Sequence, residues 1–401
     1  MNIAIICAME TPIPASRGGA TETMMTHLID VNEEERKHKF YVFSYYDFQA
    51  SVLSRNYEMT DFYYYHPNRF KERVVGLFWR VLRKVSKEKI YLHSFFVKWC
   101  AEKILNSNID VVILEGNCFQ LEYMRSLLER KKLIILHMHI DRLNLELKAC
   151  KNIIDKCDGV FAISDFCKRR MMEVVPSASN KIIVVKNTVD TDKFSRNGRE
   201  EAITQIRKKI GLKEGQLLIS YCGRIDSTKG VLELVKAMAS LEDPNLRLMI
   251  IGSSVYAGSK KNAYIKKVEE EAKKVVGGVI FTGYISQKEL PNYVSGSDIA
   301  TVPSLCLEAA GNVTIEALGC EVPVIASTQG GIPEYADKSA CLLVDVDKDF
   351  IMNYASAIHK LAYDKDLYSS LKKNTREVAV KYNKYNYYQN FDQAVNNIFN
   401  L

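Results

Sequence analysis

The chain has 401 residues, of which 47% are hydrophobic, enough to build the cores of two ordinary domains. Its 55 lysines and arginines against 48 aspartates and glutamates leave a net charge of +7, too mild a surplus for a nucleic-acid-binding protein. No apolar run approaches the length of a membrane span, and the run at 3–8 is too short for a signal peptide.

Apolar, β-branched runs alternate with helix-like segments along the first half of the chain. The predicted strands are 2–7, 40–44, 110–114, 132–137, 159–164 and 181–185. A glycine turn at 17–20 follows the first of them and leads into a helix from Thr21 to about Asp30. Continuous apolar strands that alternate with helices are typical of a parallel sheet covered on both faces.

The same pattern restarts after a charged helical stretch at 199–213. The predicted strands are 216–222, 246–251, 278–282, 299–302, 322–326 and 341–344, and the tail is helical by pattern. We therefore predict an α/β protein with two Rossmann-like, doubly wound domains, 1–192 and 193–380, that face each other across a cleft. A C-terminal helix, 381–401, is expected to pack back on the first domain. Ligands of such sheets bind at the carboxyl ends of the strands.

The ten cysteines point to a reducing compartment. None belongs to a CxxC pair, and several lie inside apolar runs. This spacing argues against a zinc site or a disulfide framework, and it predicts buried, reduced thiols in a cytoplasmic protein.

A glycine turn follows the first strand of each predicted domain. Gly18 and Gly19 allow the backbone to approach a phosphate or a sugar closely, although an ordinary tight turn is the alternative. In the second domain, Arg224 and Lys229 lie in a glycine-bracketed loop between strand and helix. Two cations beside free helix amides suit a diphosphate, and a solvated surface loop is the alternative.

The segment 303–334 carries two glutamates, Glu308 and Glu316, on either side of Gly311 and Asn312. A helix is predicted from 313 to 318, and amides at a helix start favour an anion. Glu316 suits the vicinal hydroxyls of a ribose, and Glu308 those of a transferred sugar, because a carboxylate accepts several hydrogen bonds. For Glu316 the alternative is an acid that complements the helix dipole.

A basic stretch at 69–98 has apolar residues at helical spacing. It predicts a basic amphipathic helix that suits an anionic membrane surface. The alternative is a helix that packs on the first sheet and exposes a solvated basic face.

Several of these segments together resemble a known family. They are RGGATE from Arg17, ISDFCKRRM from Ile163, KNTVDTDKF from Lys186, CGRIDSTKG from Cys222, FTGYISQKEL from Phe281, and the E-x7-E block from Glu308 with PVIAS and GGIPE. They follow in family order over nearly the whole chain, which therefore resembles the GT-B glycosyltransferases of family 4. That family is retaining and uses nucleotide sugars.

The resemblance implies a role for each matching residue. It assigns the diphosphate to Arg224 and Lys229, the ribose to Glu316, the donor sugar to Glu308, amides for phosphate and sugar to Gly311, Asn312 and Val313, and a place over the diphosphate to Gly19. It also implies an acceptor-side histidine at the end of the fourth predicted strand. Of His137 and His139, His139 matches better, and two packing histidines are the alternative. One departure is Glu321, where the family usually has glycine.

The implied activity is transfer of a hexose or related sugar with retention of configuration, by same-face attack. Glu308, Arg224, Lys229 and His139 are the expected catalytic residues. No metal is required, because the cations stabilise the leaving group. The D-x-D sequences at 190–192 and 345–347 are interpreted as turns.

The family habit implies a UDP-linked donor and a glycan acceptor, lipid-linked, in bacterial surface polysaccharide synthesis such as that of a capsule. The basic stretch predicts peripheral attachment to the inner face of the plasma membrane. Three other functions remain open on the sequence: a nucleotide-sugar epimerase of the same fold, a glycosidase that uses Glu308 and Glu316 as its carboxylate pair, and a non-catalytic sugar-nucleotide-binding module.

Overall fold

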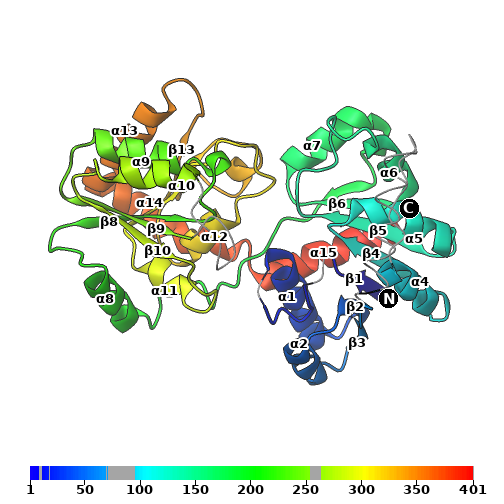
Figure 1. Cartoon of the computed structure of the whole chain (residues 1–401). Coiled ribbons are helices and arrows are strands. Elements are labelled where there is room, and N and C mark those ends of the chain that lie inside the picture. The colour runs from blue at the N-terminus through cyan, green and yellow to red at the C-terminus, as the bar shows by residue number, and fades with distance from the viewer. Residues whose placement is uncertain (9–10, 18, 69, 71–94, 253–262, 401) are drawn as a thin grey trace. The chain divides into compact units, whose positions relative to one another are not determined.

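The computed structural model describes residues 1–8, 11–17, 19–68, 70, 95–252 and 263–400. The chain divides into two compact units. Unit 1 consists of Met1–Lys186 and Lys384–Leu401, and unit 2 of Asn187–Asn383. Each unit is built on one parallel sheet with helices packed around it (Figure 1). This is the predicted pair of Rossmann-like domains.

Unit 1 has a seven-stranded sheet in the order β3-β2-β1-β4-β5-β6-β7. Its strands are β1 Asn2–Ile6, β2 Lys39–Tyr45, β3 Thr60–Tyr65, β4 Val111–Glu115, β5 Leu133–Met138, β6 Gly159–Ala162 and β7 Ile182–Val184. Its α-helices are α1 Ala20–Glu35, α2 Phe48–Leu53, α4 Phe95–Leu105, α5 Leu121–Leu128, α6 Cys150–Lys156, α7 Asp165–Val174 and α15 Lys384–Phe399. Short 3-10 turns are η1 Ser54–Asn56, η2 Cys118–Gln120 and η3 Pro176–Ala178.

Helix α15 comes from the end of the chain and lies beside α1 in unit 1 (Figure 1). Phe391 is fully buried, and its ring meets Phe40 and Phe161 edge-on at centroid distances of 6.5 and 5.9 Å. At Gly159, a Cβ atom would lie 2.8 Å from Cγ1 of Ile398, so this strand and the helix approach closely. The C-terminal segment is therefore part of the core of unit 1.

Unit 2 has a six-stranded sheet in the order β10-β9-β8-β11-β12-β13. Its strands are β8 Leu217–Cys222, β9 Leu246–Ile251, β10 Val279–Gly283, β11 Ile299–Val302, β12 Val324–Ser327 and β13 Cys341–Val344. Its α-helices are α8 Glu200–Lys209, α9 Val231–Ser240, α10 Ala263–Ala272, α11 Leu290–Ser295, α12 Asn312–Gly319, α13 Phe350–Tyr363 and α14 Lys365–Val380. The 3-10 turns are η4 Ser227–Lys229 and η5 Ile332–Glu334.

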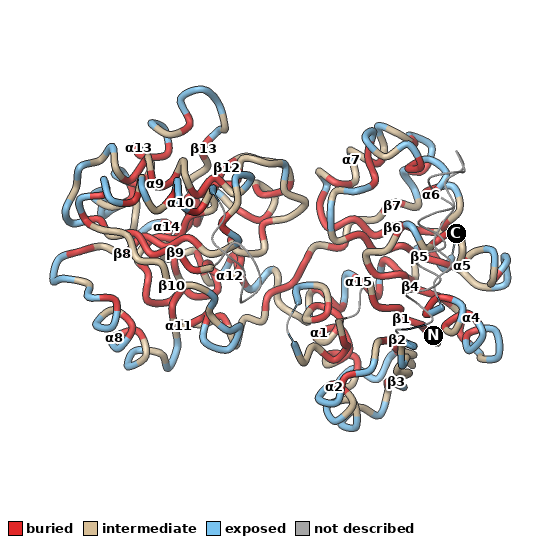
Figure 2. Tube along the Cα trace, in the orientation of Figure 1, coloured by how far each residue is buried: buried red, intermediate tan, exposed pale blue. Residues whose placement is uncertain are grey.

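Both faces of the sheet in unit 2 are buried along its central strands β9, β8, β11 and β12, most of whose residues are buried in Figure 2. Leu218 and Met249 point into a core with α8, α11, α12 and α14, whereas the next residues along the strands, Ile219 and Ile250, belong to a second core under α9, α10 and α13. This alternation explains why the strands are continuously apolar, since each side chain enters one of two dry layers. The carboxyl ends of the strands are left for polar groups.

The sequence analysis missed strand β3. Half of its residues, TDFYYY, are tyrosines, and most of the six are only half-buried because β3 is an edge strand of its sheet. An apolar-run criterion selects strands buried on both faces, and this strand is not one of them. The predicted strand 322–326 also begins later, at Val324.

Most of the basic stretch at 69–98 lies outside the described residues. The structure describes only residue 70 and residues 95–98, and the latter form the start of α4, Phe95–Leu105. None of the helices that the structure describes combines the length and the apolarity that crossing a bilayer requires.

Candidate active site

The loop from Gly223 to Gly230 follows β8, and local hydrogen bonds shape it. Asp226 caps η4 by accepting a hydrogen bond from the Thr228 amide at 3.0 Å. The Tyr221 hydroxyl donates to the carbonyl of Arg224 at 2.6 Å. The side chain of Arg224 is 70% exposed, and its guanidinium lies 3.6 Å from the carboxylate of Asp226. Arg224 is thus held at its backbone, while its charge remains available to a ligand.

Lys229, at the end of this loop, reaches the carboxylate of Glu308. Its Nζ lies 2.5 Å from Oε1 of Glu308, and the Ser304 hydroxyl donates to the same oxygen at 2.8 Å. The two charged side chains are only 22% and 20% exposed. The loops that follow β8 and β11 therefore bring one cation and one anion together in a half-buried place at the carboxyl end of the sheet.

Two glycines allow the neighbouring chain segments to approach Glu308. Gly230 has φ +68°, and a Cβ there would lie 1.9 Å from the carbonyl oxygen of Pro303. Gly330 has φ +64°, and a Cβ there would lie 2.2 Å from the carbonyl oxygen of Glu308. The next amide, of Gly331, donates to that carbonyl at 2.7 Å. Any side chain at either glycine would push apart the loops that carry Lys229 and Glu308.

Helix α12 begins just after Glu308, and its N-cap is Gly311, which has no side chain to cap the helix. The amides of the first turn, which include those of Asn312 and Val313, form the positive end of the helix. Oδ1 of Asn312 accepts a hydrogen bond from Nδ2 of Asn187 at 2.7 Å, which fixes its side chain. An uncapped helix start of this kind favours binding of an anion.

Glu316 lies further along α12 and is partly buried. Burial raises its pKa to about 7, and the positive charge of Lys193 opposes this shift only in part. None of the residues that the structure describes donates a hydrogen bond to its carboxyl group. A partly buried carboxyl group without donors among the described residues is suited to hydroxyl groups that a ligand would bring.

In unit 1, Gly18 lies outside the described residues, and Gly19 is the N-cap of α1 with φ +116°. A Cβ at Gly19 would lie 2.2 Å from Oε2 of Glu22. The hydroxyl of Thr11 donates to the other oxygen of that carboxylate. An acidic side chain therefore lies against this turn, a contact that the glycines alone did not indicate.

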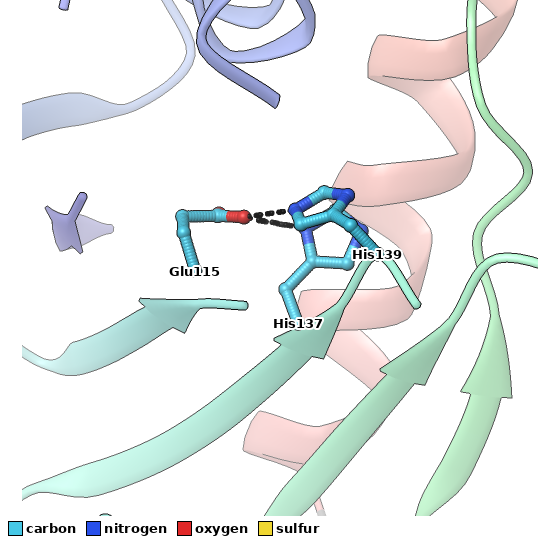
Figure 3. A group of neighbouring side chains, drawn as sticks. All are labelled: Glu115, His137 and His139. Atoms are coloured by element: carbon cyan, nitrogen blue, oxygen red, sulfur yellow. Dashed lines mark hydrogen bonds and ion pairs between the residues drawn. The ribbon is translucent and has the colours of Figure 1, made fainter. Parts of the chain in front are cut away.

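His139 follows β5 and lies in a cluster with Glu115 and His137 (Figure 3). Nε2 of His139 is 2.6 Å from the Glu115 carboxylate, and Nδ1 of His137 is 3.1 Å from it. Glu115 and His137 are fully buried, and the side chain of His139 is 9% exposed.

Burial lowers the pKa of His139, and His137 adds to this effect, although Glu115 acts in the opposite direction. For Glu115, burial alone would raise the pKa, but the two histidines outweigh it and hold the pKa at about 2. The cluster therefore combines an ionised carboxylate with a neutral His139 near pH 7.

Glu115 is a site residue that the sequence analysis missed. It is the last residue of β4, and it lies opposite His137 in the register of β4 and β5. A signal was present, because a glutamate directly after an apolar strand is exceptional. Its histidine partners, however, stand more than twenty positions along the chain, and only the sheet register brings them together.

The D-x-D segments both form turns. Oδ1 of Asp190 accepts hydrogen bonds from the amides of Asp192 and Lys193 at 3.1 and 2.9 Å. Oδ1 of Asp347 accepts from the amide of Asp349 at 2.9 Å. In both segments the first or last aspartate is used by its own backbone.

Glu321, where the resembling family usually has glycine, has φ +60°. The backbone therefore keeps the left-handed conformation that glycine would favour, and the side chain is tolerated there.

Comparison with known proteins places these sites in context. Residues 202–378, almost all of unit 2, match the family model described as glycosyl transferases group 1. The chain is 28% identical to the lipopolysaccharide 1,2-N-acetylglucosaminetransferase of Salmonella typhimurium over 79% of this chain and 83% of that one. The sequence is thus similar to those of glycosyltransferases, and unit 2 carries the match to the family model.

Solved structures share the two-domain GT-B fold of this chain over nearly its whole length. A glycosyltransferase from Rickettsia africae superposes with a TM-score of 0.74 at 18% identity, covering 99% of this chain and 98% of that one. Anabaena HepE in complex with UDP and glucose gives a TM-score of 0.72 at 15% identity, covering 98% and 99%. The Salmonella and Rickettsia proteins are described as transferases, so the comparisons do not favour the epimerase alternative.

Proposed function

We propose that this chain is a glycosyltransferase that moves a hexose or a related sugar from a UDP-linked donor to a glycan acceptor, with retention of anomeric configuration. The observation that carries the proposal is the ion pair of Lys229 with Glu308 beside the uncapped start of α12. A diphosphate needs cations and amides, and a sugar needs a hydroxyl-binding carboxylate. All of them converge in unit 2.

The donor would replace the internal ion pair with contacts of its own. Lys229 would bind the diphosphate together with Arg224, whose exposed guanidinium is 3.6 Å from its only acidic neighbour in the described salt bridges. Glu308 would turn to the sugar hydroxyls, while Gly311, Asn312 and Val313 offer amides. The site is thus arranged to stabilise the charge that grows on the leaving nucleoside diphosphate.

Glu316 is assigned to the ribose of the donor. Its buried carboxyl group lacks donors among the described residues, and two ribose hydroxyls would supply them. The choice of UDP is supported by the fold shared with Anabaena HepE, which was solved with UDP and glucose.

The reaction is proposed to need no metal ion. Lys229, Arg224 and the start of α12 supply the positive charge that a divalent cation supplies in other transferases. One aspartate of each D-x-D segment, Asp190 or Asp347, already accepts hydrogen bonds from the amides of its own turn.

The acceptor is assigned to unit 1. A lipid-linked glycan of a bacterial surface polysaccharide, such as a capsule, is supported by the likeness to a lipopolysaccharide N-acetylglucosaminetransferase. All ten cysteines lie within the described residues and are free thiols, which supports a reducing, cytoplasmic setting. Attachment to the inner face of the plasma membrane through 69–98 remains a proposal from the sequence. It predicts cosedimentation of the protein with anionic vesicles at low salt.

The proposal is tested by measuring thermal shifts and donor hydrolysis with UDP-, GDP- and ADP-sugars. A UDP-sugar should stabilise the wild type, and Lys229→Ala should bind it about 10- to 100-fold more weakly, as expected for the loss of a charge-assisted hydrogen bond. Lys273→Ala is the matched control, because Lys273 also pairs with a glutamate, at 2.8 Å, but is 69% exposed just after the end of α10. Failure of every nucleotide sugar to stabilise the wild type would refute the function. Unchanged binding in Lys229→Ala would refute the diphosphate assignment.

A further inference from the structure

The cluster of Glu115, His137 and His139 stands at the carboxyl ends of two adjacent strands of unit 1 (Figure 3). Glu115 ends β4 opposite His137 on β5, and His139 stands two residues beyond His137, on the same side of the strand. The cluster thus lies at the carboxyl ends of the strands, where ligands of parallel sheets bind. The assignment of His139 to the acceptor side leaves Glu115 without a role.

The hydrogen bonds of Glu115 determine which nitrogen of each ring carries the proton. An ionised carboxylate can only accept, so the nitrogens that face it must be N–H groups. These are Nε2 of His139 at 2.6 Å and Nδ1 of His137 at 3.1 Å. In a neutral ring the opposite nitrogen then carries a lone pair and acts as an acceptor. Nδ1 of His139 is therefore an acceptor and not a donor.

The opposite nitrogens have no partner of their own. Nδ1 of His139 and Nε2 of His137 are both buried and make no hydrogen bond with any described residue. His137 is enclosed, with its ring edge-on to Phe161 at 5.7 Å, whereas His139 keeps 9% of its side chain exposed. Nδ1 of His139 is thus an unsatisfied acceptor at the carboxyl ends of the strands, which indicates that a ligand provides the donor.

The same three residues place possible ligand atoms within 4.8 Å of one another, a spacing that a metal ion could use. Histidines that bind a metal almost always donate their other N–H to a partner. Neither outer nitrogen has one, so a metal would leave two buried N–H groups unsatisfied. The 2.6 Å contact between Glu115 and His139 is instead the length of a charge-assisted hydrogen bond.

We propose that Glu115 is a positioning residue that holds His139 as the Nε2–H tautomer, so that its Nδ1 accepts a hydrogen bond from a hydroxyl group of a sugar substrate. The role of the hydroxyl rests on the proposed transferase function, whereas the tautomer does not. His137 supports the arrangement, because its own bond to Glu115 keeps the carboxylate aligned.

The charges around His139 are consistent with this role near neutral pH. Glu115 on β4, His137 on β5 and Glu22 on α1 are the titratable groups that act on it. Burial and His137 lower the pKa of His139 and outweigh the two glutamates. Nδ1 therefore stays unprotonated at pH 7.

The tautomer is tested on the full-length protein by nitrogen NMR of 15N-labelled histidine at pH 7.5. The expected spectrum has a pyridine-like Nδ1 and a protonated Nε2 for His139, assigned with the His139→Gln variant. A protonated Nδ1 in the wild type would overturn the proposal, whether or not the enzyme is active. Stoichiometric binding of Zn²⁺ that shifts both His137 and His139 signals would also overturn it, in favour of a metal site.

Activity variants then separate the two halves of the proposal. Glu115→Gln keeps the shape but removes the charge and one of the two acceptor oxygens that hold Nε2–H of His139, so kcat should fall by about tenfold or more. His139→Gln retains a donor near Glu115 and loses Nδ1, so it should lose as much activity. Wild-type kcat in either variant would refute the role of Nδ1. We expect the KM of one of the two substrates to change. A rise in KM for the donor alone would assign the hydroxyl group to the donor, and a rise for the acceptor alone would assign it to the acceptor.

Asp392→Asn is the matched control. Asp392 also accepts a hydrogen bond from Nε2 of a buried histidine in unit 1, which is His38, at 2.9 Å. His38 directly precedes β2, however, so it lies at the amino ends of the parallel strands and not at their carboxyl ends. This variant should change stability without changing kcat or the spectrum of His139. If it lowers kcat as much as Glu115→Gln, loss of any buried carboxylate explains the effect and the positioning role is refuted. Should Glu115→Gln not fold, the wild-type spectrum and His139→Gln still decide the matter.

Discussion

At the scale of single residues, Glu316 is held in an environment that disfavours its charge. Its pKa is raised to about 7, chiefly by burial. Such a carboxyl group contributes little to the stability of the free protein, and we expect its role to lie in donor binding. Raised pKa values of this kind cluster at functional sites, where burial is part of the arrangement of the site.

Replacement of this carboxyl group is predicted to stabilise the protein at high pH. The folded state binds the proton of Glu316 up to about pH 7, whereas the unfolded state releases it near its ordinary pKa. The wild type therefore loses free energy of unfolding as the pH rises between these two values. Glu316→Gln should be more stable than the wild type at pH 8, by on the order of 1 to 3 kcal/mol, and equally stable near pH 4.5.

Urea unfolding at both pH values measures the difference, with Glu270→Gln as an exposed control. A stability gain that does not depend on pH would contradict the assignment of the raised pKa. Donor binding should weaken in the same variant, because an amide accepts fewer hydroxyl hydrogen bonds than a carboxylate.

At the scale of elements, the end of α12 contains a local strain. Glu321 has φ +60°, a conformation that costs a residue with a Cβ roughly 1–2 kcal/mol. Its amide donates to the carbonyl of Leu318 at 3.0 Å, so the turn is needed to close the helix before β12 begins. The site on α12 depends on this closure.

Relief of this strain gives a prediction. Glu321→Gly should raise the free energy of unfolding by about 0.5 to 1 kcal/mol, because glycine adopts positive φ freely but loses more entropy on folding. Thermal unfolding measures the gain. Glu321→Ala removes the same charge and keeps the Cβ, so it should give no gain. An equal gain in both variants would show that the charge of Glu321, and not its backbone, is the cause.

Several strands could be predicted from the sequence, because their own residues carry the signal. Strands such as Leu246–Ile251 and Ile299–Val302 are buried on both faces, so apolarity alone marks them. Strand β3 was missed because tyrosines at the edge of a sheet are half-exposed. The left-handed Glu321 could be suspected only from a family pattern, since its own side chain gives no signal.

Individual residues of the candidate site could be predicted from the sequence, but the contacts between them could not. Glycines and cations after strands indicated the loop of Arg224 and Lys229. That Lys229 meets Glu308 depends on loops that follow β8 and β11, which are neighbours in the sheet but lie 79 residues apart at this contact. Glu115 was missed for the same reason, because the sheet register pairs it with histidines far along the chain.

At the scale of the whole molecule, the chain returns to unit 1 to complete its core. Phe391→Ala is predicted to destabilise unit 1 by about 3–5 kcal/mol, because the ring is fully buried against two others. Hydrogen exchange followed by mass spectrometry should show faster exchange in the strands of unit 1 than in those of unit 2. Phe399→Ala is the control, since Phe399 is 46% exposed. Equal loss of protection in both units would contradict the division of the chain.

The transfer reaction itself is tested most directly by proton NMR of donor turnover. The donor that binds best in the nucleotide-sugar screen is incubated with the wild type, and the nucleoside diphosphate and the first sugar anomer released to water are followed in time. The proposed function predicts release of the diphosphate together with a sugar of the same anomeric configuration as in the donor, and loss of both in Lys229→Ala. Release of the inverted anomer first would contradict retention, and the absence of any diphosphate release would contradict the transferase function.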